Sequence, residues 1–165
     1  MQLQDTLSIP KIFIGLDIHK KSWTVSIQTD LFFHKTYSMP SNAEDLYQYV
    51  ERTFPNYAVD LVYEAGCCGF SAARYFLNLG WNVLVVNPAD VKTGDKERYQ
   101  KTDALDSKNL SNQLKSGVLK GIYIPTEEHE QFMTLARHRT QITQKLRQTK
   151  AHIKSMLLFH GIKVP

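Results

Sequence analysis

Hydrophobic and polar residues alternate along the first forty positions in the manner of short β-strands. Three such runs follow one another: Lys11–Asp17, Ser22–Gln28 and Leu31–Tyr37. In the second run the apolar side chains share one face, namely Trp23, Val25 and Ile27, which is typical of a half-buried strand. Because short turns separate the runs, with a tight one at Thr29–Asp30, an antiparallel meander is expected.

After residue 40 the apolar spacing changes to that of helices alternating with strands. Helices are expected from the Pro40–Asn42 start signal to Thr53, from Phe70 to Leu79 before Gly80, and from the N-cap Thr102 to Gly117. Strands are expected at Ala58–Tyr63 and Trp81–Val86, and Val118–Ile124 is a candidate for a small additional strand. A meander followed by this alternation predicts an α/β fold with a mixed five-stranded sheet flanked by helices.

From Thr126 onward the pattern is that of one long amphipathic helix of more than thirty residues. Its apolar residues recur at intervals of seven and four, at Leu135, Ile142, Leu146, Ile153 and Leu157, with a basic face expected opposite. The helix could pack on the sheet, or it could form an arm that pairs with a second subunit or a further domain. The narrow stripe favours the arm, so we expect a domain over residues 1–124 and a coiled-coil-like arm over residues 125–165.

The positive charge of the chain indicates a negatively charged binding partner. The chain of 165 residues has a net charge of +4, and its basic residues are clustered. One cluster lies in a polar loop, at Lys92, Lys96, Arg98 and Lys101, and the other in the long helix, at Arg137, Arg139, Lys145, Arg147, Lys150 and Lys154. Such clusters are typical of surfaces that bind the phosphate backbone of nucleic acids.

Other classes of protein are disfavoured. No apolar run approaches the ~20 residues that span a bilayer, and no secretory signal is readable, so a cytoplasmic protein is expected. The cysteines, Cys67 and Cys68, are adjacent. Neighbouring cysteines almost never form a disulfide, and two are too few for a zinc site, which usually has four ligands.

Four acidic residues lie at positions where a carboxylate is unfavourable unless its charge is compensated. Asp17 and Glu64 end apolar strands, and Asp103 and Asp106 lie three apart, on one face of the expected helix. Each acid alone is more commonly a surface carboxylate. Together they are the oxygen donors that Mg²⁺ prefers, with Mn²⁺ expected to substitute. Two such ions about 4 Å apart would clamp the attacking and leaving oxygens of a phosphodiester displacement.

His19 follows Asp17 by two residues, so it points to the same face of an extended strand. It could assist a site at Asp17. A histidine in a turn with no such role is the more common case, and the sequence alone favours that interpretation.

The motifs resemble a known family. The order of elements and acids resembles the RNase H-like superfamily. More specifically, the segments Ile14–Lys21, Tyr63–Gly66, Val85–Pro88 and Lys101–Asp106 are similar to those of the DEDD-type (RuvC-like) transposases of bacterial insertion sequences. The Lys-Thr-Asp-x-x-Asp block with an upstream Asn-Pro is the most specific of them. The resemblance runs from about Lys11 to Gly161.

The resemblance implies a metal-dependent transposase or DNA recombinase domain whose catalytic and metal-binding tetrad is Asp17, Glu64, Asp103 and Asp106. It also implies DNA as partner, a structured RNA copied from the element as a guide, and association with the nucleoid during action. The long helix would assemble a homodimer or a larger oligomer. Family members have a second, C-terminal domain that supplies a serine, and this sequence stops before it, so activity alone is expected to be incomplete.

Two other functions are left open by the residues. In an actin-like ATP-binding domain the first strand also ends in Gly-x-Asp, as Gly15–Asp17 does here. Such a site needs glycines and hydroxyls in the following turn, where this chain has Ile18–Lys21 instead. A noncatalytic nucleic-acid-binding or assembly module that uses the basic arm is the second alternative.

Overall fold

A computed structural model of the chain describes residues 9–66, 68–92 and 102–163. The chain divides into two compact units, one ending at Ile124 and one beginning at Pro125. The predicted basic loop residues Lys96, Arg98 and Lys101 lie outside the described residues.

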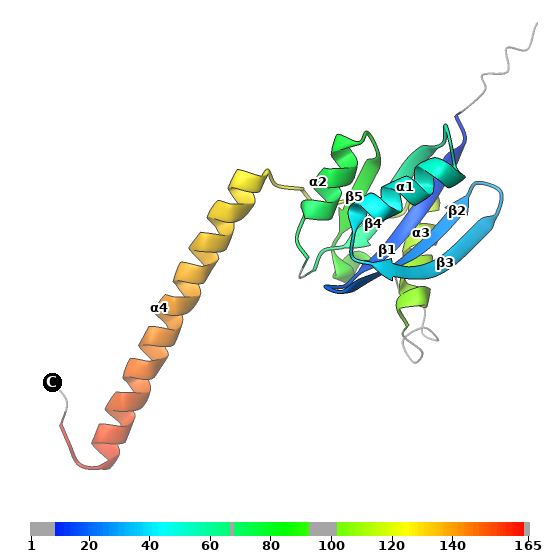
Figure 1. Ribbon diagram of the computed structural model, residues 1–165. Helices are drawn as coiled ribbons and strands as arrows, with labels where there is room; N and C mark the ends of the chain where they lie inside the picture. Colours follow the sequence, from blue (N-terminus) through cyan, green and yellow to red (C-terminus); the bar gives the residue numbers. More distant parts are fainter. Residues whose placement is uncertain (1–8, 67, 93–101, 164–165) are drawn as a thin grey trace, which may run out of the picture. The chain divides into compact units, whose positions relative to one another are not determined.

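The described residues of the first unit form five strands and three α-helices (Figure 1). The strands are β1 (Lys11–Ile18), β2 (Ser22–Thr29), β3 (Phe33–Pro40), β4 (Ala58–Glu64) and β5 (Asn82–Val86). The helices are α1 (Ala43–Thr53), α2 (Ser71–Asn78), the short 3₁₀ turn η1 (Pro88–Asp90) and α3 (Asp103–Lys115).

The strands form a single mixed sheet in the order β3-β2-β1-β4-β5. Strands β1, β2 and β3 pair antiparallel, as the predicted meander requires. Strand β4 pairs parallel to β1 and β5 parallel to β4. This mixed five-stranded sheet flanked by helices confirms the predicted α/β, RNase H-like architecture.

The two faces of the sheet are covered differently (Figure 1). Helices α1 and α2 cover one face with an apolar core that includes Leu16, Val25, Leu61 and Phe76. Helix α3 covers the other face, where a smaller apolar cluster contains Phe13, Val62, Val86, Leu110 and Leu114. Burial of these side chains away from water is the main force that holds the layers together.

Strand β2 departs from the half-buried strand that the sequence predicts. Trp23, Val25 and Ile27 do face the larger core, but the polar face of β2 is buried as well. There Ser26 Oγ lies 2.9 Å from Ser107 Oγ, and Gln28 Nε2 donates to Ser111 Oγ at 3.0 Å. Buried polar groups are tolerated when they are hydrogen-bonded to one another, and α3 supplies the partners.

The predicted ends of the helices are confirmed. Asn42 caps α1 and Thr102 caps α3, each accepting a backbone N–H with its side chain. Gly80 and Gly117 follow α2 and α3 with φ of 84° and 68°, the left-handed backbone that favours glycine after a helix.

Two strand predictions need correction. Strand β3 begins at Phe33 instead of Leu31, because Thr29 Oγ1 accepts the N–H groups of Leu31 and Phe32 and so closes a turn there. Val118–Ile124 forms no strand of its own. Within this fully described segment, Gly121 makes an isolated antiparallel bridge to Val86.

The second unit is α4 (Glu127–Phe159), a helix of 33 residues that starts at the N-cap Thr126. This confirms the predicted long helix. All α4 residues are described, and none of them is buried, including Leu135, Ile142 and Leu146 of the apolar stripe. Arg139 and Lys150 follow Leu135 and Leu146 by four residues and so lie on the same side as the stripe. The predicted basic face opposite the stripe is therefore wrong for these two residues. Along the described chain, no helix has the length and apolar character that crossing a membrane requires.

Candidate metal centre

Asp17 is placed by the packing of α3 against β1. At Gly15, two residues earlier on the same face, an added Cβ would lie 2.0 Å from the Ser107 carbonyl oxygen and 2.6 Å from the Ser111 nitrogen. Only glycine permits this approach of helix backbone to strand. The start of α3 is thereby held against the carboxyl end of β1, where Asp17 is half-buried.

The other acids come from the first turn of α3. Thr102 caps the helix, Asp103 is its first residue and exposed, and Asp106 is half-buried one turn later. The partial positive charge of a helix N-terminus stabilises carboxylates there. It offsets part of the repulsion between these two acids that the sequence predicts.

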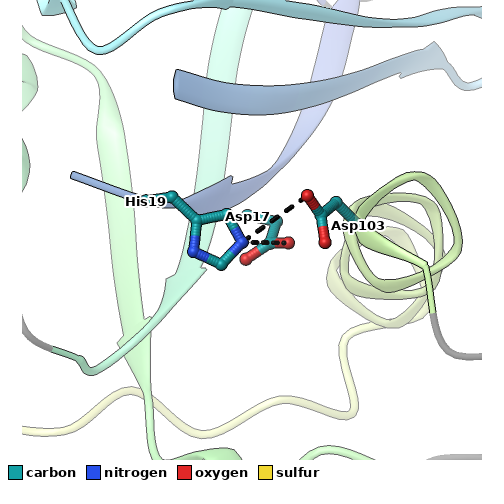
Figure 2. A group of neighbouring side chains, drawn as sticks. All are labelled: Asp17, His19 and Asp103. Carbon is teal, nitrogen blue, oxygen red and sulfur yellow. Dashed lines mark ion pairs between the residues drawn. The ribbon is translucent and has the colours of Figure 1, made fainter. Parts of the chain in front are cut away.

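Asp17, His19 and Asp103 converge (Figure 2). One ligand atom from each of the three lies within 4.8 Å of the others. His19 Nε2 is 3.2 Å from Asp17 Oδ2 and 3.6 Å from Asp103 Oδ2. Strand, turn and helix thus bring together side chains that are 86 positions apart in the sequence.

The electrostatics of Asp17 reflect this crowding. Burial raises the pKa of the Asp17 carboxyl above its ordinary value, and the negative charges of Asp103 and Asp106 raise it further. The neighbouring imidazole of His19 lowers the same pKa. A carboxyl whose charge is disfavoured by its surroundings gains from a cation placed between it and the other acids.

Glu64 is the last residue of β4, the strand that pairs with β1. The pairing of β1 with β4 ends at Leu16 opposite Tyr63, so Asp17 and Glu64 are the next residues of two adjacent parallel strands. Strand alternation puts Glu64 on the face of Val62, the face that α3 covers. Asp106 is close enough to raise the pKa of Asp17. All four predicted acids therefore lie at one end of the sheet on the side of α3.

The donor chemistry of this end fits a divalent cation. Carboxylate oxygens from two strands and one helix are the ligands that Mg²⁺ and Mn²⁺ prefer. Asp17 and Asp103 contribute the two carboxylates of the close cluster. Glu64 and Asp106, both half-buried, are not part of the close group of three that the described residues form.

A groove shares Asp103 with the cluster. It has a volume of about 540 Å³ and is lined along β2, β3 and the start of α3 by Thr24, Thr36, Tyr37, Ser38, Thr102, Asp103 and Ala104. Four of these residues carry aliphatic hydroxyls, which can donate to phosphate oxygens. The groove therefore places hydroxyl groups beside Asp103.

The described basic residues are available to solvent. Lys92 is exposed, and its carbonyl oxygen accepts hydrogen bonds from the side chains of Asn109 and Gln113 on α3. The beginning of the basic loop is thus attached to the same helix as the acids. The predicted basic residues of α4 are all exposed, namely Arg137, Arg139, Lys145, Arg147, Lys150 and Lys154.

Two features of this end go beyond what the sequence predicts. The sequence favours a turn histidine without a role at position 19, whereas in the structure His19 joins the cluster of Asp17 and Asp103. The spacing of two between Asp17 and His19 is the signal in the sequence, because it puts both side chains on the same face. The buried hydroxyls of Ser26 and Ser107 are not anticipated at all. Their signal is the polar alternation in β2 together with Ser107 and Ser111 at a spacing of four on one face of α3.

Comparison with known proteins agrees with the resemblance of the motifs. Residues 14–161 match the model of the IS110-type DEDD transposase family, which is described as a transposase. The chain is 33% identical over 101 residues, covering 60% of its length, to y4qE of Sinorhizobium fredii, which is named as a putative transposase. It is 23% identical over 159 residues, or 93% of its length, to the transposase for insertion sequence element IS1533 of Leptospira borgpetersenii. The chain spans 25% and 45% of the lengths of these two relatives. Because the family model covers nearly all of its residues, this chain belongs to the IS110-type DEDD transposase family.

Proposed function

We propose that this chain is the metal-dependent phosphodiester cleavage and strand-transfer domain of a transposase that acts on DNA. The observation that supports it best is the meeting of Asp17 with Asp103, an acid at a strand end and an acid at a helix start, in a chain of a transposase family. The fold itself gains little from a charged Asp17, because the surroundings of this carboxyl raise its pKa.

In this proposal Asp17 and Asp103 hold Mg²⁺ or Mn²⁺, and Glu64 and Asp106 complete the ligand set from the adjacent strand and the next helical turn. Bound divalent ions supply Lewis acidity toward the phosphodiester and orient the attacking and leaving oxygens. The work of the protein is to hold the four carboxylates at fixed positions. The close contact of α3 with Gly15 supports this role, because it leaves the helix little room to shift.

The nucleic acid would follow the groove that Asp103 lines. Hydroxyls of Thr36 and Ser38 would contact its backbone, with Lys92 and the basic residues of α4 adding charge. The predicted contacts Lys96, Arg98 and Lys101 remain part of the proposal. A structured guide RNA would be bound through the same basic residues, and the exposed apolar stripe of α4 would pair subunits.

Calorimetric titration with Mn²⁺ tests the metal site. Asp17→Asn keeps the size of the side chain and removes its charge, so it should weaken Mn²⁺ binding by about tenfold or more. Substitution of residues that support metal ligands lowers metal affinity on this scale. Asp45→Asn is the matched control, because Asp45 is exposed on α1 beyond the opposite face of the sheet. Equal affinity of the two variants would refute the metal site.

Salt dependence tests the nucleic-acid part. Removal of one positive charge that neutralises a phosphate should reduce the slope of log affinity against log salt by about 0.9 for duplex DNA. The double substitution Arg137→Gln with Arg147→Gln, at two exposed residues outside the apolar stripe of α4, should reduce the slope, and Arg52→Gln on α1 should not. A chain that binds ATP and shows no salt-dependent DNA binding would favour the actin-like alternative. DNA binding without any metal affinity would favour the noncatalytic module.

A further inference from the structure

His19 lies at the centre of the acidic cluster although it follows the strand. Strand β1 ends at Ile18, and the backbone N–H of His19 donates to the Ser22 carbonyl at 3.1 Å, which closes the turn to β2. The imidazole points from this turn toward Asp17 and Asp103, and Nε2 is the nitrogen that faces both carboxylates (Figure 2).

The spacing of the three atoms matches neighbouring ligands of one cation. In an octahedral site with bonds of about 2.1 Å, adjacent ligand atoms are roughly 3 Å apart. His19 Nε2 is 3.2 Å from Asp17 Oδ2 and 3.6 Å from Asp103 Oδ2. Small side-chain rotations suffice to place all three atoms around one ion, because 54% of the His19 side chain and 59% of the Asp103 side chain are exposed.

The stability gained from ion pairs with Asp17 and Asp103 is a weak explanation for the position of His19. Pairs between exposed charged side chains contribute little to stability, typically about 0–1 kcal/mol. The ring nonetheless bridges two acids that belong to different elements of the fold. Neutral imidazole nitrogen is a good ligand for first-row transition metals and a poor one for Mg²⁺.

We propose that His19 is a nitrogen ligand of the metal held by Asp17 and Asp103. This position is then a mixed nitrogen and oxygen site that favours Mn²⁺ and related transition metals over Mg²⁺. The inference rests on the proposed metal site and adds the residue that sets its metal preference. Glu64 and Asp106 remain oxygen ligands.

Pulsed electron paramagnetic resonance of bound Mn²⁺ tests the inference directly, because a ligating imidazole gives a nitrogen hyperfine coupling. The coupling should be present in the unmodified chain and absent in His19→Ala. His138→Ala is the matched control, because His138 is an exposed histidine on α4. Folding of each variant is checked by circular dichroism, and the exposed position of His19 in a turn leads us to expect native spectra.

Affinities give a second readout. His19→Ala should weaken Mn²⁺ binding by about tenfold and Mg²⁺ binding by much less. His19→Asp, which makes the ligand set all oxygen, should restore binding with the preference moved toward Mg²⁺ and with no nitrogen coupling.

The outcomes separate the two proposals. Mn²⁺ that binds tightly without nitrogen coupling overturns the inference and leaves an oxygen-only site. A coupling that survives in His19→Ala overturns it as well, because the nitrogen ligand is then another residue. Absence of Mn²⁺ binding in the unmodified chain overturns the proposed function itself. Nitrogen coupling that disappears only in His19→Ala supports both.

Discussion

Replacing Gly15 by alanine tests how the fold positions its acids. The added methyl carbon would lie 2.0 Å from the Ser107 carbonyl oxygen, whereas ordinary contacts begin near 3.4 Å. Helix α3 must therefore retreat from β1 by roughly 1.4 Å, since neither backbone can give way easily. Overpacking of this kind typically destabilises a protein by about 1–3 kcal/mol.

The retreat also stretches the hydrogen bonds that join α3 to β2. Ser26 Oγ to Ser107 Oγ and Gln28 Nε2 to Ser111 Oγ are 2.9 and 3.0 Å long, and each is worth about 1 kcal/mol. We therefore expect Gly15→Ala to lower the free energy of unfolding by about 2–5 kcal/mol. The same shift moves Asp103 away from Asp17, so Mn²⁺ affinity should fall in the protein that remains folded.

Urea unfolding and Mn²⁺ titration measure the two effects. Gly66→Ala is the control, because a methyl group there would lie 3.9 Å from the Glu64 carbonyl oxygen, which is an ordinary contact distance. A Gly15→Ala protein as stable as the unmodified chain would contradict the close approach of α3. Lower stability with unchanged Mn²⁺ affinity would show that α3 does not position the metal ligands.

Three further predictions concern the same unit. The pKa of Asp17 is raised on folding, mainly by burial, so the metal-free protein should gain stability as the pH falls from neutrality through this raised pKa to the ordinary aspartate value. Asp17→Asn should abolish this gain and raise the thermal midpoint at neutral pH; a lower midpoint would contradict it. Thr102→Ala removes the N-cap of α3 and should cost about 1 kcal/mol in urea unfolding. Gln28→Ala removes one buried and one partly buried hydrogen bond and should cost about 2–3 kcal/mol. Gln48→Ala, on the exposed side of α1, should cost less than about 0.5 kcal/mol.

Local chemistry explains why most elements are predictable from the sequence. Asn42, Gly80, Thr102 and Gly117 fix helix ends through bonds or backbone angles that involve only near neighbours. Strands β1 and β4 are recognisable as short apolar runs, because both faces of each strand are covered. The strand order is restricted by the same pattern, because a meander and two crossover helices leave few ways to build one sheet, but the structure is needed to choose among them.

The rest depends on contacts between distant positions. The polar face of β2 is buried because Ser107 and Ser111 arrive from more than 80 residues away, and no local pattern distinguishes such a face from one exposed to water. His19 is ambiguous in the sequence for the same reason, since its second carboxylate, Asp103, comes from α3. The four acids are recognisable from their strand-end and helix-start positions. Their joint role as ligands stays a prediction until metal binding is measured.

The polar contact surface between α3 and β2 has a consequence for sequence change. Apolar side chains attract one another without regard to direction, so a helix that rests on them alone can slide or rotate slightly at little cost. The hydrogen bond between Ser26 and Ser107 and the one that Gln28 donates to Ser111 are directional, so they fix both the rotation and the axial position of the helix. Exchange of these uncharged residues for alanine would therefore change how the carboxylates of α3 are oriented, even though both serines are fully buried.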